Sequence, residues 1–396
     1  MTWEKKTLSD VADFYNGKAH EKEISENGEF IVVNSKYISR DGSVIKRTKS
    51  QHFPLFQGDI VMVMSDVPNG KALAKCLIID EDNLYSLNQR ICCIRAKEGV
   101  FLPFLKYQLN RNKYFLGFNN GETQTNLRKA DILDCPIYLP PLPVQKKIVE
   151  KLDAAFAEID RAVEIANERH INTSSLIAAV QNSLFEDMPL SIPRLKLSEV
   201  AKFENGDRGK NYPSKKYQIS EGVPFVNAGD FSLDGDITRD GMAYISEERF
   251  DLLGAGKFKK DDVLFCLRGS LGKSAINKTL KRGAIASSLV IIRALQERVH
   301  ADYLYAFMRS DIVKKYISET AGGAAQPNLS AKVVMGYKIP VPSSEEQKVI
   351  ADKFWALRQR GLDAISLIKK KKSELMALKI AILNQAFSGE FTKDAA

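Results

Sequence analysis

Apolar residues recur at alternating steps of three and four along two long stretches of the chain, residues 143–190 and 343–396. This spacing places one apolar stripe along a helix and is typical of a coiled-coil seam. Each stretch follows a proline-rich segment and begins with a Gln-Lys pair, at Gln145 and Gln347, where proline no longer blocks helix formation. The predicted seam residues are Leu152, Phe156, Ile159, Val163, Ile177, Val180 and Leu184 in the first helix, and Phe354, Leu357, Ile365, Ile368, Leu375, Leu378 and Ile382 in the second.

These two helices are longer than one globular domain needs, since roughly 40 helical residues extend about 60 Å. We expect them to pair within the chain as an antiparallel coiled coil, because each follows its own globular half and an antiparallel pair would hold those halves at opposite ends. The alternative is that each helix is only the last buried helix of its half. Gly361 interrupts the second seam, and Gly389 is expected to cap that helix.

Short β-branched runs bounded by Gly, Asp and Asn predict strands in the rest of the chain. Such runs lie within residues 56–64 and 90–96, and they have counterparts within residues 258–266 and 288–294. Residues 101–114 and 301–318 have helical spacing instead and are predicted to pack on the sheet. Both halves are therefore predicted to be rich in strands.

The two halves repeat one another. One offset relates Gln145 to Gln347 and also QTNL at residues 124–127 to QPNL at 326–329, while the openings at Leu8 and Leu197 match at another offset. We predict an α+β fold with two tandem strand-rich domains, separated by an antiparallel coiled coil of two long helices and related by a pseudo-twofold internal repeat. The predicted boundaries are 1–142 and 191–342 for the strand-rich domains, and 143–190 and 343–396 for the helices.

The composition is that of an ordinary globular protein, with 44% hydrophobic residues and neither a signal peptide nor an apolar run of membrane-spanning length. We expect a soluble, cytoplasmic protein. The five cysteines lack CxxC spacing and mostly lie in apolar runs, which favours buried, reduced thiols over disulfides or a zinc site. The four histidines show no spacing of metal ligands, so no metal is expected.

The net charge of +9 is compatible with an acidic partner, and its distribution is uneven. Residues 141–190 carry 5 Lys and Arg against 8 Asp and Glu, whereas residues 191–342 carry 24 against 17. The first long helix is thus acidic, while the second half and the second helix are basic. Ion pairs across the helix pair would fit this distribution, although each contributes little.

No catalytic arrangement is found in the sequence. The segment 268–274 resembles the end of a phosphate-binding loop, but Leu267 stands where that motif requires glycine. The Asp-Pro-Pro-Tyr type of motif with which amino-methyltransferases hold a flipped base is absent, and the histidines lack the spacing of a catalytic triad. The sequence therefore indicates a binding protein without catalytic residues.

Polar turn segments rich in Gly, Asn, Gln, Ser, Arg and Lys recur at equivalent places in the two halves. Asn and Gln side chains bind adenine, Arg binds guanine, and Lys and backbone N–H groups hold phosphates. Any one segment is compatible with an ordinary polar turn, but the repetition favours DNA contacts for the set. The predicted DNA-binding residues are Lys18, Asn34, Lys36, Tyr37, Arg40, Lys71, Asn88, Gln89, Arg90, Asn120, Thr123, Gln124, Asn126, Arg208, Lys210, Tyr212, Asn227, Asp230, Arg268, Ser270, Lys273, Ser287, Gln326 and Asn328.

Together these motifs resemble the DNA specificity subunits of type I restriction-modification systems. The resemblance rests on the LxxVA…NG opening of each half, the Gly58-Asp59 and Asp261-Asp262 pairs before hydrophobic runs, and the Arg-Gly-Ser-Leu-Gly-Lys segment. It also rests on the Gln-x-Asn-Leu segments, the proline-rich steps into the long helices and the tail at residues 387–391. The first half has residues 64–71 where the second has Gly-Ser-Leu-Gly-Lys, so the correspondence of Lys71 with Lys273 is the weaker part of the match.

The resemblance implies two recognition domains that each read half of an asymmetric bipartite DNA site, with the helices as a ruler between them. It also implies that the chain has no catalysis and no cofactor of its own. Double-stranded DNA, two modification subunits that use S-adenosylmethionine, and restriction subunits that use ATP and Mg²⁺ are the implied partners. Two other classes remain as alternatives: a stand-alone DNA methyltransferase or nuclease, and a coiled-coil scaffold protein.

Overall fold

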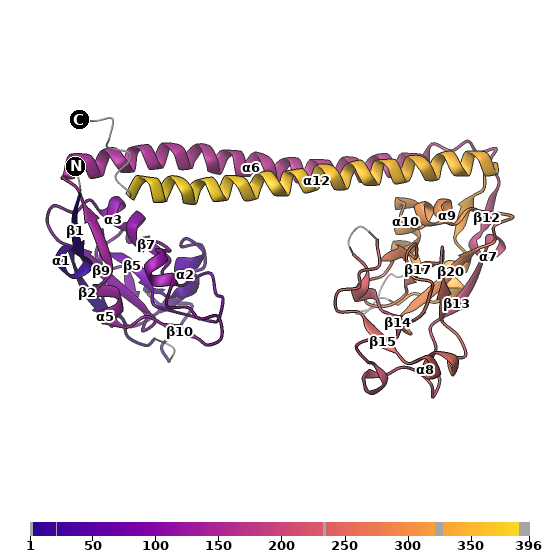
Figure 1. The fold of residues 1–396 in the computed structure, drawn as a ribbon, viewed down its shortest axis with the longest axis horizontal. Helices are drawn as coiled ribbons and strands as arrows, with labels where there is room; N and C mark the ends of the chain where they lie inside the picture. Colours follow the sequence, from indigo (N-terminus) through magenta and orange to yellow (C-terminus); the bar gives the residue numbers. More distant parts are fainter. Residues whose placement is uncertain (1–2, 21, 233–234, 321–327, 388–396) are drawn as a thin grey trace. The chain divides into compact units, whose positions relative to one another are not determined.

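A computed structural model describes residues 3–20, 22–232, 235–320 and 328–387 (Figure 1). The chain divides into two compact units. The first unit contains Met1–Ala166 and Lys371–Ala396, and the second contains Asn167–Lys370. Each unit therefore includes part of both long helices, whereas the sequence assigned the helices to segments of their own. The predicted domain boundaries remain a prediction.

The first unit is built on a four-stranded antiparallel sheet in the order β2 (Ala12–Asn16), β9 (Ile91–Ala96), β5 (Ile60–Val63) and β7 (Cys76–Ile78). A second sheet has the order β4 (Arg47–Thr48), β3 (Phe30–Val33) and β8 (Tyr85–Leu87), with β3 and β8 parallel. The two-stranded pairs are β1 (Glu4–Thr7) with β11 (Pro136–Leu139), and β6 (Ser65–Asp66) with β10 (Thr125–Asn126).

The second unit repeats this topology. Its central sheet has the order β13 (Ala201–Asn205), β20 (Leu289–Ala294), β17 (Val263–Cys266) and β18 (Ser274–Ile276). Its other sheet has the order β15 (Ala243–Ile245), β14 (Val223–Val226), β19 (Arg282–Ile285) and β16 (Lys257–Lys259), and the described part of the first unit has only a single bridge, Pro54 with Ser86, at the place of β16. β12 (Arg194–Lys196) pairs with β21 (Lys338–Pro340). The prediction of two tandem strand-rich halves is confirmed.

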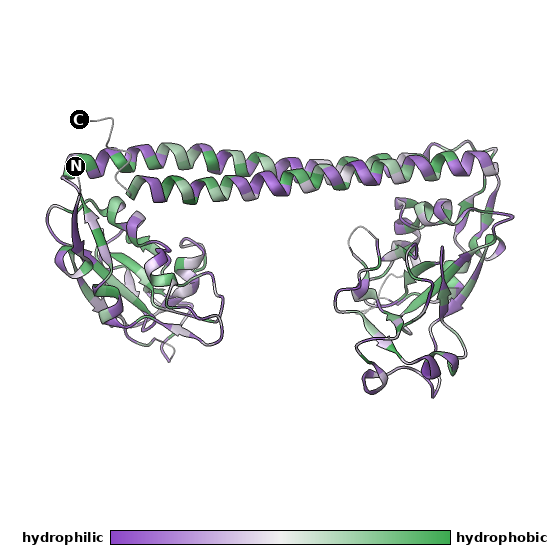
Figure 2. Ribbon diagram, in the orientation of Figure 1, coloured by the Kyte–Doolittle hydropathy of each residue, from purple (hydrophilic) through white to green (hydrophobic). Residues whose placement is uncertain are grey.

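The central strands are buried on both faces, which explains their uninterrupted apolar sequences. Along β5, Ile60 and Met62 belong to one core cluster, whereas Val61 and Val63 belong to another. β17 alternates in the same way, with Val263 and Phe265 on one side and Leu264 and Cys266 on the other. The hydropathy colouring shows these apolar strands inside both units (Figure 2). All five cysteines are buried and free, as the sequence predicted.

Short helices cover the sheets. In the first unit they are α1 (Leu8–Val11), α2 (Ser35–Ser39), α3 (Leu102–Leu109), α4 (Lys113–Leu116) and α5 (Lys129–Leu133). In the second unit they are α7 (Leu197–Val200), η1 (Lys215–Tyr217), η2 (Ala228–Asp230), α8 (Glu247–Asp251), α9 (Ala301–Met308), α10 (Asp311–Thr320) and α11 (Ala331–Met335).

Each helix predicted over residues 101–114 and 301–318 is in fact two helices. Arg111 has a positive φ of 57°, which an α-helix does not accommodate, and it separates α3 from α4. Arg309 and Ser310 separate α9 from α10. The periodicity continues across both interruptions, and for that reason the sequence did not reveal them.

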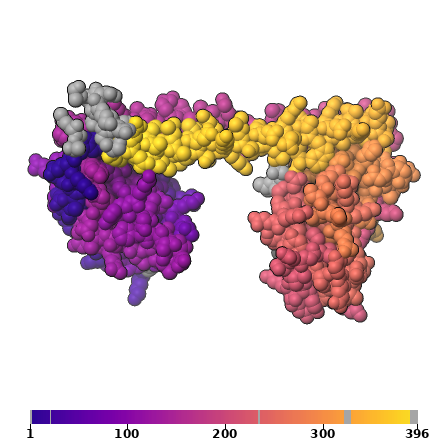
Figure 3. All heavy atoms as spheres, in the orientation of Figure 1, coloured from indigo at the N-terminus to yellow at the C-terminus, as the bar shows by residue number. Residues whose placement is uncertain are grey.

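The long helices are α6 (Leu142–Glu186) and α12 (Ser344–Phe387). In the first unit, Ile148 near the start of α6 shares a core cluster with Ala386 near the end of α12. In the second unit, a Cβ atom on Gly361 would lie 2.2 Å from Ile177, so this glycine allows the two helices to approach closely. The space-filling view shows α12 (yellow) lying along α6 (magenta) within each unit (Figure 3).

Leu378 is 48% exposed and does not belong to the seam, whereas all the other predicted seam residues are buried or half-buried. Phe185 is fully buried in the second unit and was missed, because Leu184 satisfied the heptad spacing one position earlier. The expected cap at Gly389 lies outside the described residues.

The two glutamines that begin the long helices each bridge three backbone groups. Gln145 Oε1 accepts from the Phe101 N–H at 2.8 Å, and its Nε2 donates to the carbonyls of Gly99 and Pro140 at 3.1 and 2.8 Å. Gln347 makes the same set of bonds in the second unit, with Oε1 accepting at 2.9 Å and Nε2 donating at 3.1 and 3.0 Å. Each glutamine therefore ties the start of its helix to the loop before α3 or α9.

The structure corrects one sequence pairing by one residue. Ile60 pairs with Ile94, and Val263 pairs with Ile292, so Ile60 corresponds to Val263. The sequence pairing of residues 56–64 with 258–266 would have placed Ile60 on Asp262 and is wrong, whereas the pairing of Gly58-Asp59 with Asp261-Asp262 is confirmed.

Candidate nucleic-acid interface

One end of the central sheet in the first unit collects most of the predicted DNA-binding segments. β2 and β5 end there and the antiparallel β9 begins there, so their loops meet. Lys18 forms a β-bridge with Asn88, and the Met64 N–H donates to the Arg90 carbonyl at 3.1 Å. We call the loop segments at this end, residues 16–20, 34–40, 64–75, 88–90 and 119–127, the first loop edge.

Asn34 joins this edge because β3 runs parallel to β8. The Asn88 N–H donates to the Val33 carbonyl at 3.1 Å, which places Asn34 beside the loop after β8. The Asn34 side-chain oxygen caps α2 by accepting from the N–H groups of Lys36 and Tyr37, both at 2.9 Å.

The loop after β5 and the strand β10 are held together by side chains. Ser65 pairs with Asn126 across the two strands. Gln124 Nε2 donates to Ser65 Oγ at 2.7 Å and to Asn126 Oδ1 at 3.3 Å. Within the loop, one Asp66 carboxylate oxygen accepts two backbone N–H groups, at 2.7 and 3.1 Å. This part of the edge is therefore ordered by its own polar groups.

The second unit has the same convergence at the ends of β13 and β17 and the start of β20. The Leu267 N–H donates to the Ser288 carbonyl and the Leu329 N–H donates to the Leu267 carbonyl, each at 2.9 Å. Arg268 forms a β-bridge with Asn328. We call residues 205–212, 227–230, 267–273, 286–288 and 328–329 the second loop edge.

The predicted DNA-binding residues fall into three groups by exposure. Two are buried, Tyr37 at 7% and Asp230 at 6% exposure, and Gln326 lies outside the described residues. The half-buried residues are Asn34, Asn88, Tyr212, Asn227, Lys273 and Ser287. The exposed residues are Lys18, Lys36, Arg40, Lys71, Gln89, Arg90, Asn120, Thr123, Gln124, Asn126, Arg208, Lys210, Arg268, Ser270 and Asn328. Direct DNA contact by any of them remains a prediction.

Two of the predicted residues have clear tasks within the protein. Asn227 Oδ1 accepts from the Gly229 N–H at 2.7 Å, and the Asp230 carboxylate accepts from the Asn227 N–H at 2.8 Å. Burial raises the pKa of Asp230, while the hydrogen bond from Asn227 and the charge of Lys273 oppose that shift. These side chains shape the loop after β14.

The structural counterpart of Lys273 is Lys75, so the sequence pairing with Lys71 is wrong. The Lys75 carbonyl accepts from the Val63 N–H at 3.1 Å, and the Lys273 carbonyl accepts from the Cys266 N–H at 2.9 Å. Each lysine ammonium also donates to a carbonyl of the neighbouring short helix, at 2.9 Å in the first unit and 3.0 Å in the second. Lys71 lies in a longer loop whose extra residues shifted the sequence alignment.

The two loop edges are rich in exposed cations. The first carries Lys18, Lys36, Arg40, Lys71 and Arg90, and the second carries Arg208, Lys210 and Arg268. Clustered Lys and Arg side chains create a positive potential that attracts phosphates and is screened by salt. Amide and arginine side chains at the same edges are the groups that bind base edges.

The opposite end of each central sheet carries a bidentate ion pair that the sequence analysis did not identify. Arg95 Nε and Nη2 each donate to Asp59 at 2.8 Å, and Arg293 donates in the same way to Asp262 at 2.8 and 2.7 Å. Asp59 and Asp262 are buried, at 2% and 1% exposure. The sequence could have indicated this ion pair, because in both halves an Asp precedes one strand and an Arg lies near the end of the neighbouring strand.

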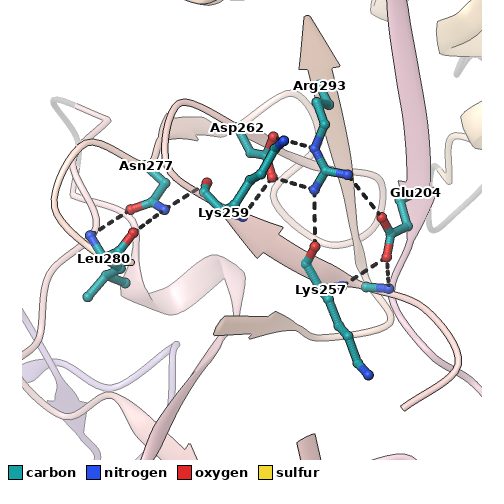
Figure 4. A network of polar contacts seen from close by, with 8 residues as sticks. Glu204, Lys257, Lys259, Asp262, Asn277, Leu280 and Arg293 are labelled. Carbon is teal, nitrogen blue, oxygen red and sulfur yellow. Dashed lines mark hydrogen bonds and ion pairs between the residues drawn. The ribbon is translucent and has the colours of Figure 1, made fainter. Parts of the chain in front are cut away.

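The second unit extends this pair into a network (Figure 4). Arg293 also lies 3.5 Å from Glu204 and donates to the Lys257 carbonyl at 3.1 Å. Glu204 accepts from the N–H groups of Gly256 and Lys257 at 2.7 and 3.0 Å. The hydrogen bonds from Arg293 to Asp262 raise the pKa of the guanidinium, so Arg293 stays charged at any ordinary pH.

Within residues 3–20, 22–232, 235–320 and 328–387, no group of three or more His, Cys, Asp or Glu side chains is arranged to hold a metal ion. None of the helices in this described part of the chain has the length and apolar character needed to cross a bilayer.

Comparison with known proteins places the chain in a family. The family model described as "Type I restriction modification DNA specificity domain" matches residues 1–168 and 193–377. The MjaVIII type I restriction enzyme specificity subunit of Methanocaldococcus jannaschii is 23% identical over 98% of this chain and 92% of its own. The EcoBI specificity subunit of Escherichia coli is 23% identical over 77% of this chain and 69% of its own.

Solved structures agree on the fold. A chain from a type I restriction-modification system has a TM-score of 0.75 at 19% identity and covers 98% of this chain and 97% of its own. The HsdS subunit from Thermoanaerobacter tengcongensis has a TM-score of 0.57 at 20% identity, with coverage of 98% and 97%. Because the family model matches both halves of the sequence and the same sheet topology occurs in both units, the chain belongs to the type I restriction modification DNA specificity domain family.

Proposed function

We propose that this chain is the sequence-specific DNA-binding subunit of a type I restriction-modification complex, with each loop edge reading one half of a bipartite site. The observation that carries the proposal is that both units carry exposed Lys, Arg and Asn side chains at the same end of the same sheet. Membership of the DNA specificity family supports it independently.

The chemistry of the loop edges fits the two parts of DNA recognition. Lysine and arginine side chains bind phosphates and so position the protein, whereas amides and arginines that reach the grooves distinguish base pairs. Because the two edges present different side chains on the same backbone frame, we propose that the half-sites differ in sequence and that the target is not a palindrome.

We further propose that α6 and α12 form one antiparallel coiled coil that sets the gap between the half-sites. In both units the contacts run in the antiparallel sense, such as Asp160 with Lys379 at 2.8 Å in the first and Ile177 beside Gly361 in the second. A helix the length of α6 extends roughly 65 Å. Insertion of whole turns after Val163 should change the gap and leave both half-sites unchanged. A changed half-site would contradict this role.

The chain is proposed to act without catalysis or cofactor of its own. Two modification subunits that use S-adenosylmethionine, and restriction subunits that use ATP and Mg²⁺, are the proposed partners that carry out the chemistry. The loop edges are charged, and the sequence contains no recognisable catalytic motif. Both observations support a division in which this chain recognises DNA and its partners carry out the chemistry.

The test is methylation mapping of genomic DNA from cells that express this chain with its modification subunit, compared with cells that express the modification subunit alone. A bipartite, asymmetric motif that requires this chain is the expected result. DNA binding should also weaken steeply with salt, because phosphate contacts release counterions. Absence of any new motif, with both proteins soluble and associated, would reject the proposal in favour of a scaffold.

A further inference from the structure

One position at the loop edges differs in chemistry while its backbone setting is the same. Ser65 pairs with Asn126 in the first unit, and Arg268 pairs with Asn328 in the second. The residue before each, Met64 or Leu267, accepts a hydrogen bond from the leucine that follows the asparagine, at 2.8 and 2.9 Å. Ser65 and Arg268 therefore occupy one structural position, the second residue after the central strands β5 and β17.

In the first unit this position is closed. Ser65 is only 8% exposed, and its hydroxyl accepts from Gln124 Nε2 at 2.7 Å. The same Gln124 Nε2 also donates to Asn126 Oδ1 at 3.3 Å. Both amide hydrogens of Gln124 are thus used within the protein. Ser65 supports its neighbours and presents no cation to DNA.

In the second unit the position is open and positively charged. Arg268 is exposed, and none of the residues that the structure describes accepts a hydrogen bond from its guanidinium. Its backbone is fixed, because its carbonyl accepts from Cys266 Sγ at 2.9 Å and it forms the bridge with Asn328. The next residue, Gly269, has a φ of 76°, and a Cβ atom there would meet nothing within 4 Å. The guanidinium of Arg268 is thus free among the described residues, while the backbone of Arg268 is held in place.

Two neighbouring cations of the second loop edge, Arg208 and Lys273, are partly occupied, in contrast to Arg268. Arg208 Nη2 donates to the Ser287 carbonyl at 3.3 Å, and Lys273 Nζ donates to the Ala228 carbonyl at 3.0 Å. Lys273 is also half-buried. Among the described residues none takes up a guanidinium donor of Arg268, and the planar arrangement of its N–H groups matches two adjacent acceptors.

We propose that Arg268 is a specificity-determining residue that donates two hydrogen bonds to the O6 and N7 atoms of a guanine in the half-site bound by the second loop edge. Ser65 gives the first loop edge no equivalent guanine contact, so this one position makes the two half-sites differ. The proposal rests on the proposed function. Bidentate Arg–guanine pairing is the commonest base-specific contact in the major groove.

The experiment is methylation mapping with this chain and its modification subunit, using Arg268→Ala and Arg268→Lys. We expect preference for guanine at one position of one half-site to fall about 5- to 150-fold in both variants, with the other half-site and the gap unchanged. Arg268→Lys keeps the charge but loses the fork, so it should retain more total methylation than Arg268→Ala while showing the same relaxed position.

Arg208→Ala is the matched control, because Arg208 is an exposed cation on the same edge with one of its donors already in use. It should lower methylation evenly across sequences without relaxing any position. The proposal is overturned if neither half-site contains guanine, if Arg268→Ala lowers methylation evenly, or if Arg268→Lys fully restores selectivity. Failure of the proposed function would differ from all three, because the unaltered chain would then direct no methylation motif.

Discussion

The two ends of each central sheet differ in how closely the two units match one another. At the end opposite the loop edges, both units have a buried Asp paired with an Arg and a buried glutamine at the start of a long helix. At the loop edges, Ser65 is replaced by Arg268, and the loop after β5 is longer than the loop after β17. The buried Asp–Arg pair and the glutamine form a frame that is the same in both units, whereas the surface proposed to read DNA differs between them.

The shared frame also tolerates different surroundings for its arginine. Arg95 lies over the rings of Tyr15 and Phe56, at 5.1 and 4.9 Å from their centroids. Arg293 has Glu204 at 3.5 Å where the first unit has Tyr15. Cation–π contact and a second carboxylate both stabilise a guanidinium. The common requirement is therefore the bidentate aspartate, and its removal should have the largest effect on stability.

We expect Asp59→Ala and Asp262→Ala each to lower the free energy of unfolding of their own unit by roughly 2–3 kcal/mol, because a partly buried arginine loses its bidentate partner. Urea unfolding measures the loss. Cysteine labelling assigns it, since Cys266 lies in the second unit and the other four buried thiols lie in the first. The shared role of this ion pair would be contradicted if cysteines of the unaltered unit were labelled faster, or if the loss in free energy of unfolding were well under 1 kcal/mol.

Gln145→Ala and Gln347→Ala should each lower the free energy of unfolding by roughly 1–3 kcal/mol, because each leaves buried backbone groups without partners. The same unfolding measurement checks this. Gln57→Ala is the control at an exposed position and should change stability by less than about 0.5 kcal/mol. Unequal losses at Gln145 and Gln347 would show that the two helix starts are not equivalent.

Glu204→Gln should lower the stability of the second unit by about 1 kcal/mol, because the charge beside Arg293 is lost while two backbone N–H groups keep an acceptor. Tyr15→Phe at the same position of the first unit should be nearly neutral, since the ring over Arg95 remains. A larger loss for Tyr15→Phe would mean that the phenol, not the ring, supports the arginine. Thermal unfolding of the two variants makes the comparison.

The smallest expected difference concerns the lysines. Lys75→Ala and Lys273→Ala should each lower stability by about 0.5–1 kcal/mol, because each removes a hydrogen bond to a short helix, and the ion pair that Lys75 also makes with the exposed Asp41 adds little. Lys71→Ala should have no measurable effect on stability, because its side chain is exposed in the longer loop. If Lys71 and Lys273 behaved alike while Lys75 did not, the structural correspondence would be refuted.

The sequence predicted the repeat, the strand-rich halves and the long helices because those features follow from periodicity and from proline and glycine positions. It failed where a feature depends on contacts across the fold. The left-handed Arg111 that divides α3 from α4 leaves no mark in the periodicity, and Lys75 was displaced from its counterpart by a loop of different length. Gln145 was recognised as a repeated residue, but its three buried hydrogen bonds required the structure.

The candidate site was predictable as a set of loops but not as individual contacts. Turn composition located segments that the sheet topology then brought to one end of each unit. It could not separate Asn227, which caps a turn, from Arg268, which is free among the described residues. Exposure and hydrogen-bond partners make that distinction, and both arise from tertiary structure.

The most direct test of the central claim is methylation mapping of chains altered at one loop edge only. Substitution of Arg90 and Asn126 by alanine changes the first edge, and substitution of Arg268 and Asn328 changes the second. Each pair should alter one half-site and leave the other half-site and the gap intact. A pair of substitutions at one edge that changed both half-sites would contradict the assignment of one half-site to each edge.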